Sequence, residues 1–199
     1  MIEDSTGQLL VQKYRISLNQ KKSVNLPIKT NDGHLLQLRH EVHINRAYID
    51  GTKLSSELEI ALLQNDMGKF NERLAMWCKF VKKNNLISLC SDEPWSSIDR
   101  FVIEGSYLDI GPINLMAQGG DLIPFDFEWE IEGKIPLSWY VTRSSLGFVV
   151  NCSTVQQQSL WRDIAKVVYR SLTNENLTER MLRLSSELEN EFQGTVAKA

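Results

Sequence analysis

The chain is poor in cysteine and has no long apolar run. It has 199 residues with three cysteines, Cys78, Cys90 and Cys152, and no CxxC pair. An odd number at wide spacing does not indicate a zinc ribbon or a disulfide framework. No window approaches the roughly 18 apolar residues of a membrane-spanning helix, and the N-terminus lacks the basic start and apolar run of a signal peptide. We therefore expect a cytoplasmic protein without a membrane span.

Clusters of basic residues are also missing, apart from the pairs Lys21-Lys22 and Lys82-Lys83. The formal net charge is −3, and the isoelectric point is near 5.7. Both values argue against a dedicated nucleic-acid binder, so no nucleic-acid partner is expected. The 42% hydrophobic and 24% charged fractions are those of an ordinary globular chain. We find neither an internal repeat nor a low-complexity segment.

Strand-like segments dominate the first 48 residues. Residues 8–18 have the β-branched and aromatic content of a strand, and residues 24–30 form another strand-like segment. Asn31-Asp32-Gly33 then gives a strong hairpin signal, because Asn and Gly tolerate positive φ angles. The return strand, 34–44, places Leu36 and Leu38 on one face. We predict a small antiparallel sheet, and we assign 1–47 to a reduced N-terminal β lobe.

The hydrophobic period changes to that of helices after residue 51. A short helix is predicted over 55–63, and Asp66 can cap a longer one. Its apolar residues recur at helical spacing and should face a core: Phe70, Leu74, Trp77, Cys78 and Val81. Three more helices are predicted over 137–146, 155–172 and 177–192, the last with Asn176 and Glu179 as a capping box. Residues 48–199 are thus expected to form a mainly helical C-terminal lobe.

A second hairpin interrupts this helical lobe. Residues 86–100 are predicted to form a loop, and 101–103 a short strand. Apolar character resumes over 113–116, and Gly119-Gly120 turns the chain back into 122–125. The predicted fold class is therefore α+β, with a small N-terminal antiparallel sheet followed by a helical lobe that carries a short β-hairpin.

The most informative motif surrounds this hairpin. It reads Leu108-Asp-Ile-Gly-Pro-Ile-Asn-Leu115, followed eleven residues later by Asp126-Phe-Glu-Trp-Glu130. Asp109, Asn114 and Asp126 are side chains of the kind that a phosphoryl-transfer site uses to orient a hydroxyl and to hold a divalent metal. Pro112 stiffens the loop by fixing φ, and Gly111 permits a close approach of backbone.

The segments Asp109-Ile-Gly-Pro-Ile-Asn114 and Pro124-Phe-Asp-Phe-Glu-Trp129 resemble the protein-kinase-like superfamily, most closely its aminoglycoside-phosphotransferase branch. Tyr48–Leu54 looks like the segment in which that family leaves its hinge and enters the first helix of the large lobe. The acid-loop pattern is also similar to that of kinase-like domains attached to methyltransferases and glycosyltransferases of bacterial surface-polysaccharide assembly.

The resemblance implies a set of roles. Asp109 would be the catalytic residue that takes the proton of the acceptor hydroxyl or orients that hydroxyl, and Asn114, Asp126 and Glu128 would hold Mg²⁺. Lys13 would pair with the phosphates of ATP or GTP. The acceptor would be a hydroxyl of a small molecule or a saccharide.

The sequence also departs from that family. No glycine-rich loop precedes Lys13, and Tyr107 and Leu108 stand where the family has His and then Gly or Arg. These departures favour an alternative, a non-catalytic kinase-like accessory domain (a pseudokinase) that acts beside an upstream transferase domain or a partner protein.

Two further alternatives come from the residues themselves. Asp109 with Asp126 or Glu128 could form a two-carboxylate hydrolase. In a purely structural interpretation, Asp109 and Asn114 cap turns and Lys13 is a surface lysine.

Overall fold

The computed structural model describes most of the chain from residue 50 onward and five short strands before it. The described residues are 2–3, 9–12, 24–29, 35–40, 45–47, 50–84, 86–91, 95–125, 128–152 and 159–197.

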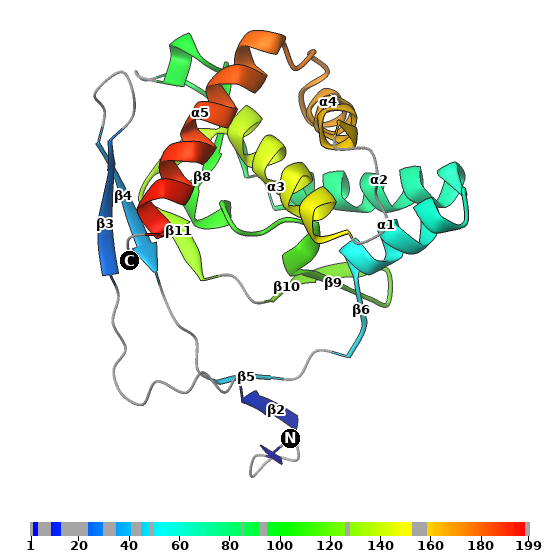
Figure 1. Cartoon of the computed structure of the whole chain (residues 1–199). Coiled ribbons are helices and arrows are strands. Elements are labelled where there is room, and N and C mark those ends of the chain that lie inside the picture. Colours follow the sequence, from blue (N-terminus) through cyan, green and yellow to red (C-terminus); the bar gives the residue numbers. More distant parts are fainter. Residues whose placement is uncertain are drawn as a thin grey trace.

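The described residues form helices and small antiparallel sheets, so the predicted α+β class is confirmed (Figure 1). The helices are α1 (Leu54–Leu63), α2 (Met67–Lys83), α3 (Leu137–Asn151), α4 (Leu160–Thr173) and α5 (Glu179–Val196).

Each strand pairs in one of several three-stranded antiparallel sheets. The first consists of β1 (Ile2–Glu3), β2 (Leu9–Gln12) and β5 (Asn45–Ala47), and the second of β3 (Val24–Lys29), β4 (Leu35–His40) and β11 (Trp129–Ile131). A third contains β6 (Thr52–Lys53), β9 (Leu115–Gln118) and β10 (Asp121–Pro124), and a fourth contains β7 (Ile87–Leu89), β8 (Phe101–Glu104) and β12 (Lys134–Pro136).

The N-terminal hairpin is confirmed in its strands. β3 pairs with β4 in a register that sets Lys29 opposite Leu35, while the predicted turn between them lies outside the described residues. Leu36 and Leu38 are buried and Arg39 is exposed, as the alternation predicts. The third strand of this sheet is β11, which comes from beyond residue 47. The division at 47/48 therefore stays a prediction.

The predictions made from local sequence signals are confirmed in the middle of the chain. The side chain of Asp66 accepts a hydrogen bond from the Lys69 amide at 2.9 Å, which is the predicted N-cap. The predicted apolar stripe of α2 is its buried face. Gly119 and Gly120 have positive φ angles and connect β9 to β10, so the second hairpin is also confirmed.

Helix α3 lies at the centre of the helical part. It packs against α4 on one side and α5 on the other (Figure 1). Ten of its residues are buried, including Trp139, Tyr140 and Phe148. A helix that is buried on nearly all sides belongs to the interior of a domain, and α3 therefore forms the support on which the 105–114 loop rests.

Several expectations about element boundaries were wrong, among them the following. The N-cap of α5 is Thr178, whose hydroxyl accepts from the Met181 amide at 3.2 Å, rather than Asn176. The predicted 86–100 loop contains strand β7 and a 3₁₀ turn, η1 (Trp95–Ser97), whose Trp95 is buried. Helix α3 extends to Asn151 rather than to residue 146.

A buried carboxylate joins three elements of this core. Asp99 is 2% exposed and accepts hydrogen bonds from the backbone amides of Phe101 and Ser138, at 2.9 and 2.7 Å, and from the hydroxyl of Tyr169 at 2.7 Å. Burial raises the pKa of Asp99, while the same donors lower it. The carboxylate thereby links β8, the first turn of α3, and α4.

Replacing Asp99 should destabilise the protein. Asp99→Asn places an amide NH₂ where an oxygen accepts from a buried donor, so we expect a loss of about 2 kcal/mol in the free energy of unfolding. Urea denaturation followed by circular dichroism measures this loss. The control is Asp121→Asn, which removes an exposed ion pair with Lys83 and should cost less than about 1 kcal/mol. Equal losses for the two variants would contradict the role of Asp99.

Candidate functional site

The candidate site is built on the loop of residues 105–114, which contains two 3₁₀ turns, η2 (Gly105–Tyr107) and η3 (Pro112–Asn114). Gly111 makes the predicted close approach. A Cβ at this position would lie 2.7 Å from the Ser144 hydroxyl oxygen and 2.8 Å from the Ser144 Cβ. Only a glycine therefore lets the loop lie this close to α3.

Asp109 uses both of its carboxylate oxygens. Oδ1 accepts from the guanidinium of Arg143 at 3.2 Å, and Oδ2 accepts from the backbone amide of Glu128 at 3.2 Å. The Asp109 side chain is 14% exposed and that of Arg143 is 15% exposed. The carboxylate is therefore held in one orientation, and one of its two partners is a backbone amide of residues 125–130, which we call the acidic segment.

Asn114 lies beside Asp109. Its side-chain Nδ2 donates to the Asp109 backbone carbonyl at 2.8 Å, and the backbone carbonyl of Asn114 accepts from the Phe125 amide at 2.9 Å. Asn114 is 9% exposed. Because the NH₂ group is committed to Asp109, the amide orientation is fixed and its oxygen is directed away from that carbonyl.

A buried tyrosine supports the centre of the loop. The Tyr140 hydroxyl donates to the Ile110 carbonyl at 2.8 Å and accepts from the Trp77 indole at 3.0 Å. Burial raises the pKa of Tyr140, so the group remains a neutral donor. The main chain next to Asp109 is thereby tied to both α2 and α3.

Arg143 is in turn fixed from α5. Its guanidinium donates to Glu189 at 2.6 Å and lies 4.1 Å from the centre of the Phe192 ring. Glu189, 7% exposed, also accepts from the Trp139 indole at 3.1 Å and from Gln193 at 2.7 Å. We call the connected side chains Asp109, Arg143 and Glu189 the acid–arginine–acid chain.

A cavity of about 440 Å³ opens beside this chain. Asp109, Arg143 and Glu189 line it together with polar side chains of α3 and α5, and its apolar wall includes Leu108 and Leu146. Polar groups that converge above an apolar wall are typical of a site for a polar small molecule.

The structure brings together three of the residues that the sequence predicted. Asp109 and Asn114 are in direct contact, and the Glu128 backbone is hydrogen-bonded to Asp109. Asp126 and Lys13 lie outside the described residues. The described neighbours of Asp126, namely Phe125 and Glu128, are both hydrogen-bonded to the 109–114 loop. The assigned roles stay predictions, as does the two-carboxylate hydrolase.

The oxygen donors at this site suit Mg²⁺ in type. Carboxylate and amide oxygens are hard ligands, and Mg²⁺ usually binds one or two carboxylates together with phosphates and waters. Within the described part of the chain, no group of three His, Cys, Asp or Glu side chains is placed to hold a metal ion. Binding of Mg²⁺ at this site would therefore depend on the fixed Asn114 amide and on the acidic segment, rather than on a set of carboxylates alone.

Sequence reasoning missed Arg143 and Glu189. One signal was present, because Arg143 is the only charged residue in the fifteen residues of α3. A single arginine in such an apolar helix requires a buried partner. The partner itself could not be read from the sequence, because Glu189 is 46 residues away.

Comparisons with known proteins give no relative. No family model, no curated protein and no solved structure matches the chain. Among the described residues, no helix is both long enough and apolar enough to cross a membrane.

Arg143 should be essential for stability. Arg143→Met leaves Asp109 and Glu189 buried without their shared cation, so we expect a loss of about 3 kcal/mol in the free energy of unfolding. The matched control is Arg183→Met, which removes an exposed contact with Glu187 at 3.9 Å and should cost less than about 1 kcal/mol. Chemical denaturation measures both, and a loss below 1 kcal/mol for Arg143→Met would contradict the assigned network.

Proposed function

We propose that this chain is a kinase-like phosphotransferase domain that transfers a phosphoryl group from a metal-bound nucleotide to a hydroxyl of a small molecule or saccharide. The observation that carries the proposal is the pair of hydrogen bonds that join the loop to the acidic segment, from Phe125 to Asn114 and from Glu128 to Asp109. Phosphoryl transfer depends chiefly on positioning of the reactants and on charge neutralisation, and a rigidly held acid loop meets the first requirement.

Each residue has a defined role in this proposal. Asp109 orients the acceptor hydroxyl and takes its proton as the new ester bond forms. Asn114, Asp126 and Glu128 would hold Mg²⁺, and Lys13 would bind the nucleotide phosphates. When bound, Mg²⁺ neutralises charge on the transferring phosphoryl group.

The cavity beside Asp109 supports an acceptor with several hydroxyls. It is lined by the amide or charged side chains of Asn151, Glu189, Asn190 and Gln193. The amides can donate to hydroxyls and accept from them, and the Glu189 carboxylate can accept from them. Its volume of about 440 Å³ falls within the range of sites that enclose small molecules.

A second candidate function is a non-catalytic kinase-like accessory domain of a glycan-modifying protein. The observation that favours it is the state of Asp109, whose two oxygens are already hydrogen-bonded to Arg143 and to the Glu128 amide. An acid with such partners can serve to hold the loop and α3 together. In that case a methyltransferase or glycosyltransferase domain, or a partner protein, supplies the activity.

Nucleotide binding separates the two candidates. Calorimetry with ATP or GTP should give saturable heat only when Mg²⁺ is present, and Asp126→Ala should abolish it because a metal ligand is lost. Asp163→Ala, which removes an exposed carboxylate from α4, should bind as the unmodified chain does. No heat from a folded protein under any of these conditions would contradict the phosphotransferase and leave the accessory domain.

Catalysis has its own test. With a panel of sugars as acceptors, Asp109→Asn should lower kcat by roughly a hundredfold or more, because the general base is lost. Nucleotide affinity should be unchanged, since Asp109 is assigned to the acceptor. Turnover is followed by release of nucleoside diphosphate. An Asp109→Asn variant with full kcat would rule out the assigned role.

A further inference from the structure

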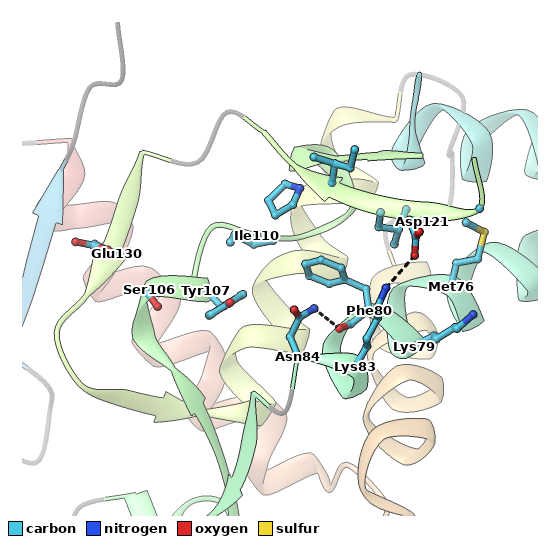
Figure 2. Close-up of a pocket in the computed structure, with 14 residues that line it drawn as sticks. Met76, Lys79, Phe80, Lys83, Asn84, Ser106, Tyr107, Ile110, Asp121 and Glu130 are labelled. Carbon is cyan, nitrogen blue, oxygen red and sulfur yellow. Dashed lines mark hydrogen bonds and ion pairs between the residues drawn. The ribbon is translucent and has the colours of Figure 1, made fainter. Parts of the chain in front are cut away.

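A second cavity lies against the same loop. It has a volume of about 490 Å³ and is bounded by the C-terminal half of α2, by η2 and by β10 (Figure 2). Among the described residues, it shares no lining residue with the cavity beside Asp109. Tyr107 and Ile110 line the second cavity, whereas Leu108, Asp109 and Gly111 line the first. The loop is therefore a wall of two separate cavities.

The walls of the second cavity are apolar and partly aromatic. Phe80 and Tyr107 are half-buried, and Ile110 is buried. Leu122 and Pro124 of β10 complete the lining on the other side. In Figure 2 the Phe80 ring lies in the middle of the group, between Ile110 and Tyr107 on one side and Lys83 and Asp121 on the other. Half-buried aromatic rings of this kind favour a flat apolar ligand that can stack on them.

Two lysines, Lys79 and Lys83, and two carboxylates, Asp121 and Glu130, line the cavity. Lys83 is paired with Asp121 at 3.1 Å, and Glu130 is paired with Arg39 at 3.1 Å. Lys79 is exposed, and no carboxylate of the described residues forms an ion pair with it. Because Lys83, Asp121 and Glu130 are engaged in these ion pairs, Lys79 is the cation of the described lining that an anionic group can pair with.

We infer that this second cavity, between α2 and β10, binds a small molecule with a flat apolar body and one anionic group, such as an aromatic carboxylate. The cavity volume lies within the roughly 300–1,000 Å³ typical of small-ligand sites. The apolar body stacks on Phe80 and Tyr107, and the anion pairs with Lys79. This inference is independent of the proposed function, because no residue assigned to phosphoryl transfer lines the cavity.

The probe for the test is naphthalene-2-sulfonate, with naphthalene-2-methanol as its neutral counterpart. Calorimetry on the full chain should show saturable 1:1 binding of the sulfonate, and binding of the alcohol should be about threefold to fivefold weaker because the exposed Lys79 contact is lost. Backbone amide shifts in NMR spectra should change at Phe80, Tyr107 and Ile110. Changes centred on Asp109 and Arg143 instead would overturn the inference.

Two charge-reversal variants provide a matched comparison on one helix. Lys79→Glu should weaken sulfonate binding about tenfold or more. Lys69→Glu changes the net charge equally, but Lys69 lies ten residues away along α2, about 15 Å by the helical rise, and should leave binding unchanged. Equal weakening in both variants, or no saturable binding by the unmodified chain, would overturn the proposed site.

The cavity can also be blocked from its exposed edge. Ser106 is exposed and lines the cavity, so Ser106→Trp should fill the space and abolish binding while the thermal melting curve stays cooperative. Undiminished sulfonate binding by a folded Ser106→Trp variant would place the ligand elsewhere. A polypeptide of a partner protein that occupies this surface and excludes the sulfonate would likewise count against a small-molecule site.

Discussion

The fold and the candidate site both depend on one guanidinium group. Arg143 lies between the carboxylates of Asp109 and Glu189, at 3.2 and 2.6 Å, with the Phe192 ring beside it. All three charged side chains are largely removed from water, so each would be costly to bury without the others. The acid–arginine–acid chain is thus the link between the loop, the central helix α3 and the last helix α5. It fixes the direction of the one acid to which a catalytic role is assigned.

Further hydrogen bonds connect the acid–arginine–acid chain to the rest of the site. The Tyr140 hydroxyl, which accepts from the Trp77 indole, donates to the Ile110 carbonyl, and the Asn114 amide donates to the Asp109 carbonyl. These hydrogen bonds restrict the backbone of the loop. The acidic segment is attached to this rigid loop at Phe125 and Glu128. β11 then continues into a sheet with β4, where an Arg39–Glu130 pair spans the two strands. The predicted N-terminal hairpin is thereby joined to the site through backbone hydrogen bonds.

Sequence reasoning succeeded where the signal was local. The Asp66 cap, the buried stripe of α2 and the Gly119-Gly120 turn each depend on residues a few positions apart. Sequence reasoning failed where the contacting residues are far apart in the chain, as in the pairing of β11 with β4 or of Arg143 with Glu189. Hydrophobic periods and motif spacings do not predict such contacts. The α5 cap was misplaced by two residues, since Asn176 and Thr178 are both good N-caps and only the chain path decides between them. At the candidate site, the motif pointed to Asp109 and Asn114, which the structure places in contact, but it gave no sign of the arginine that orients the acid.

The central claim is that the loop and the acidic segment together hold a cation beside Asp109. Paramagnetic line broadening by Mn²⁺, with a non-hydrolysable ATP analogue present, tests it most directly, because broadening falls off steeply with distance from the metal. The account predicts loss of the backbone amide signals of residues 109–111, 113–114 and 128–131 at low Mn²⁺, while those of α4 remain sharp. Uniform broadening across the chain, or broadening that spares the 109–114 loop, would contradict it.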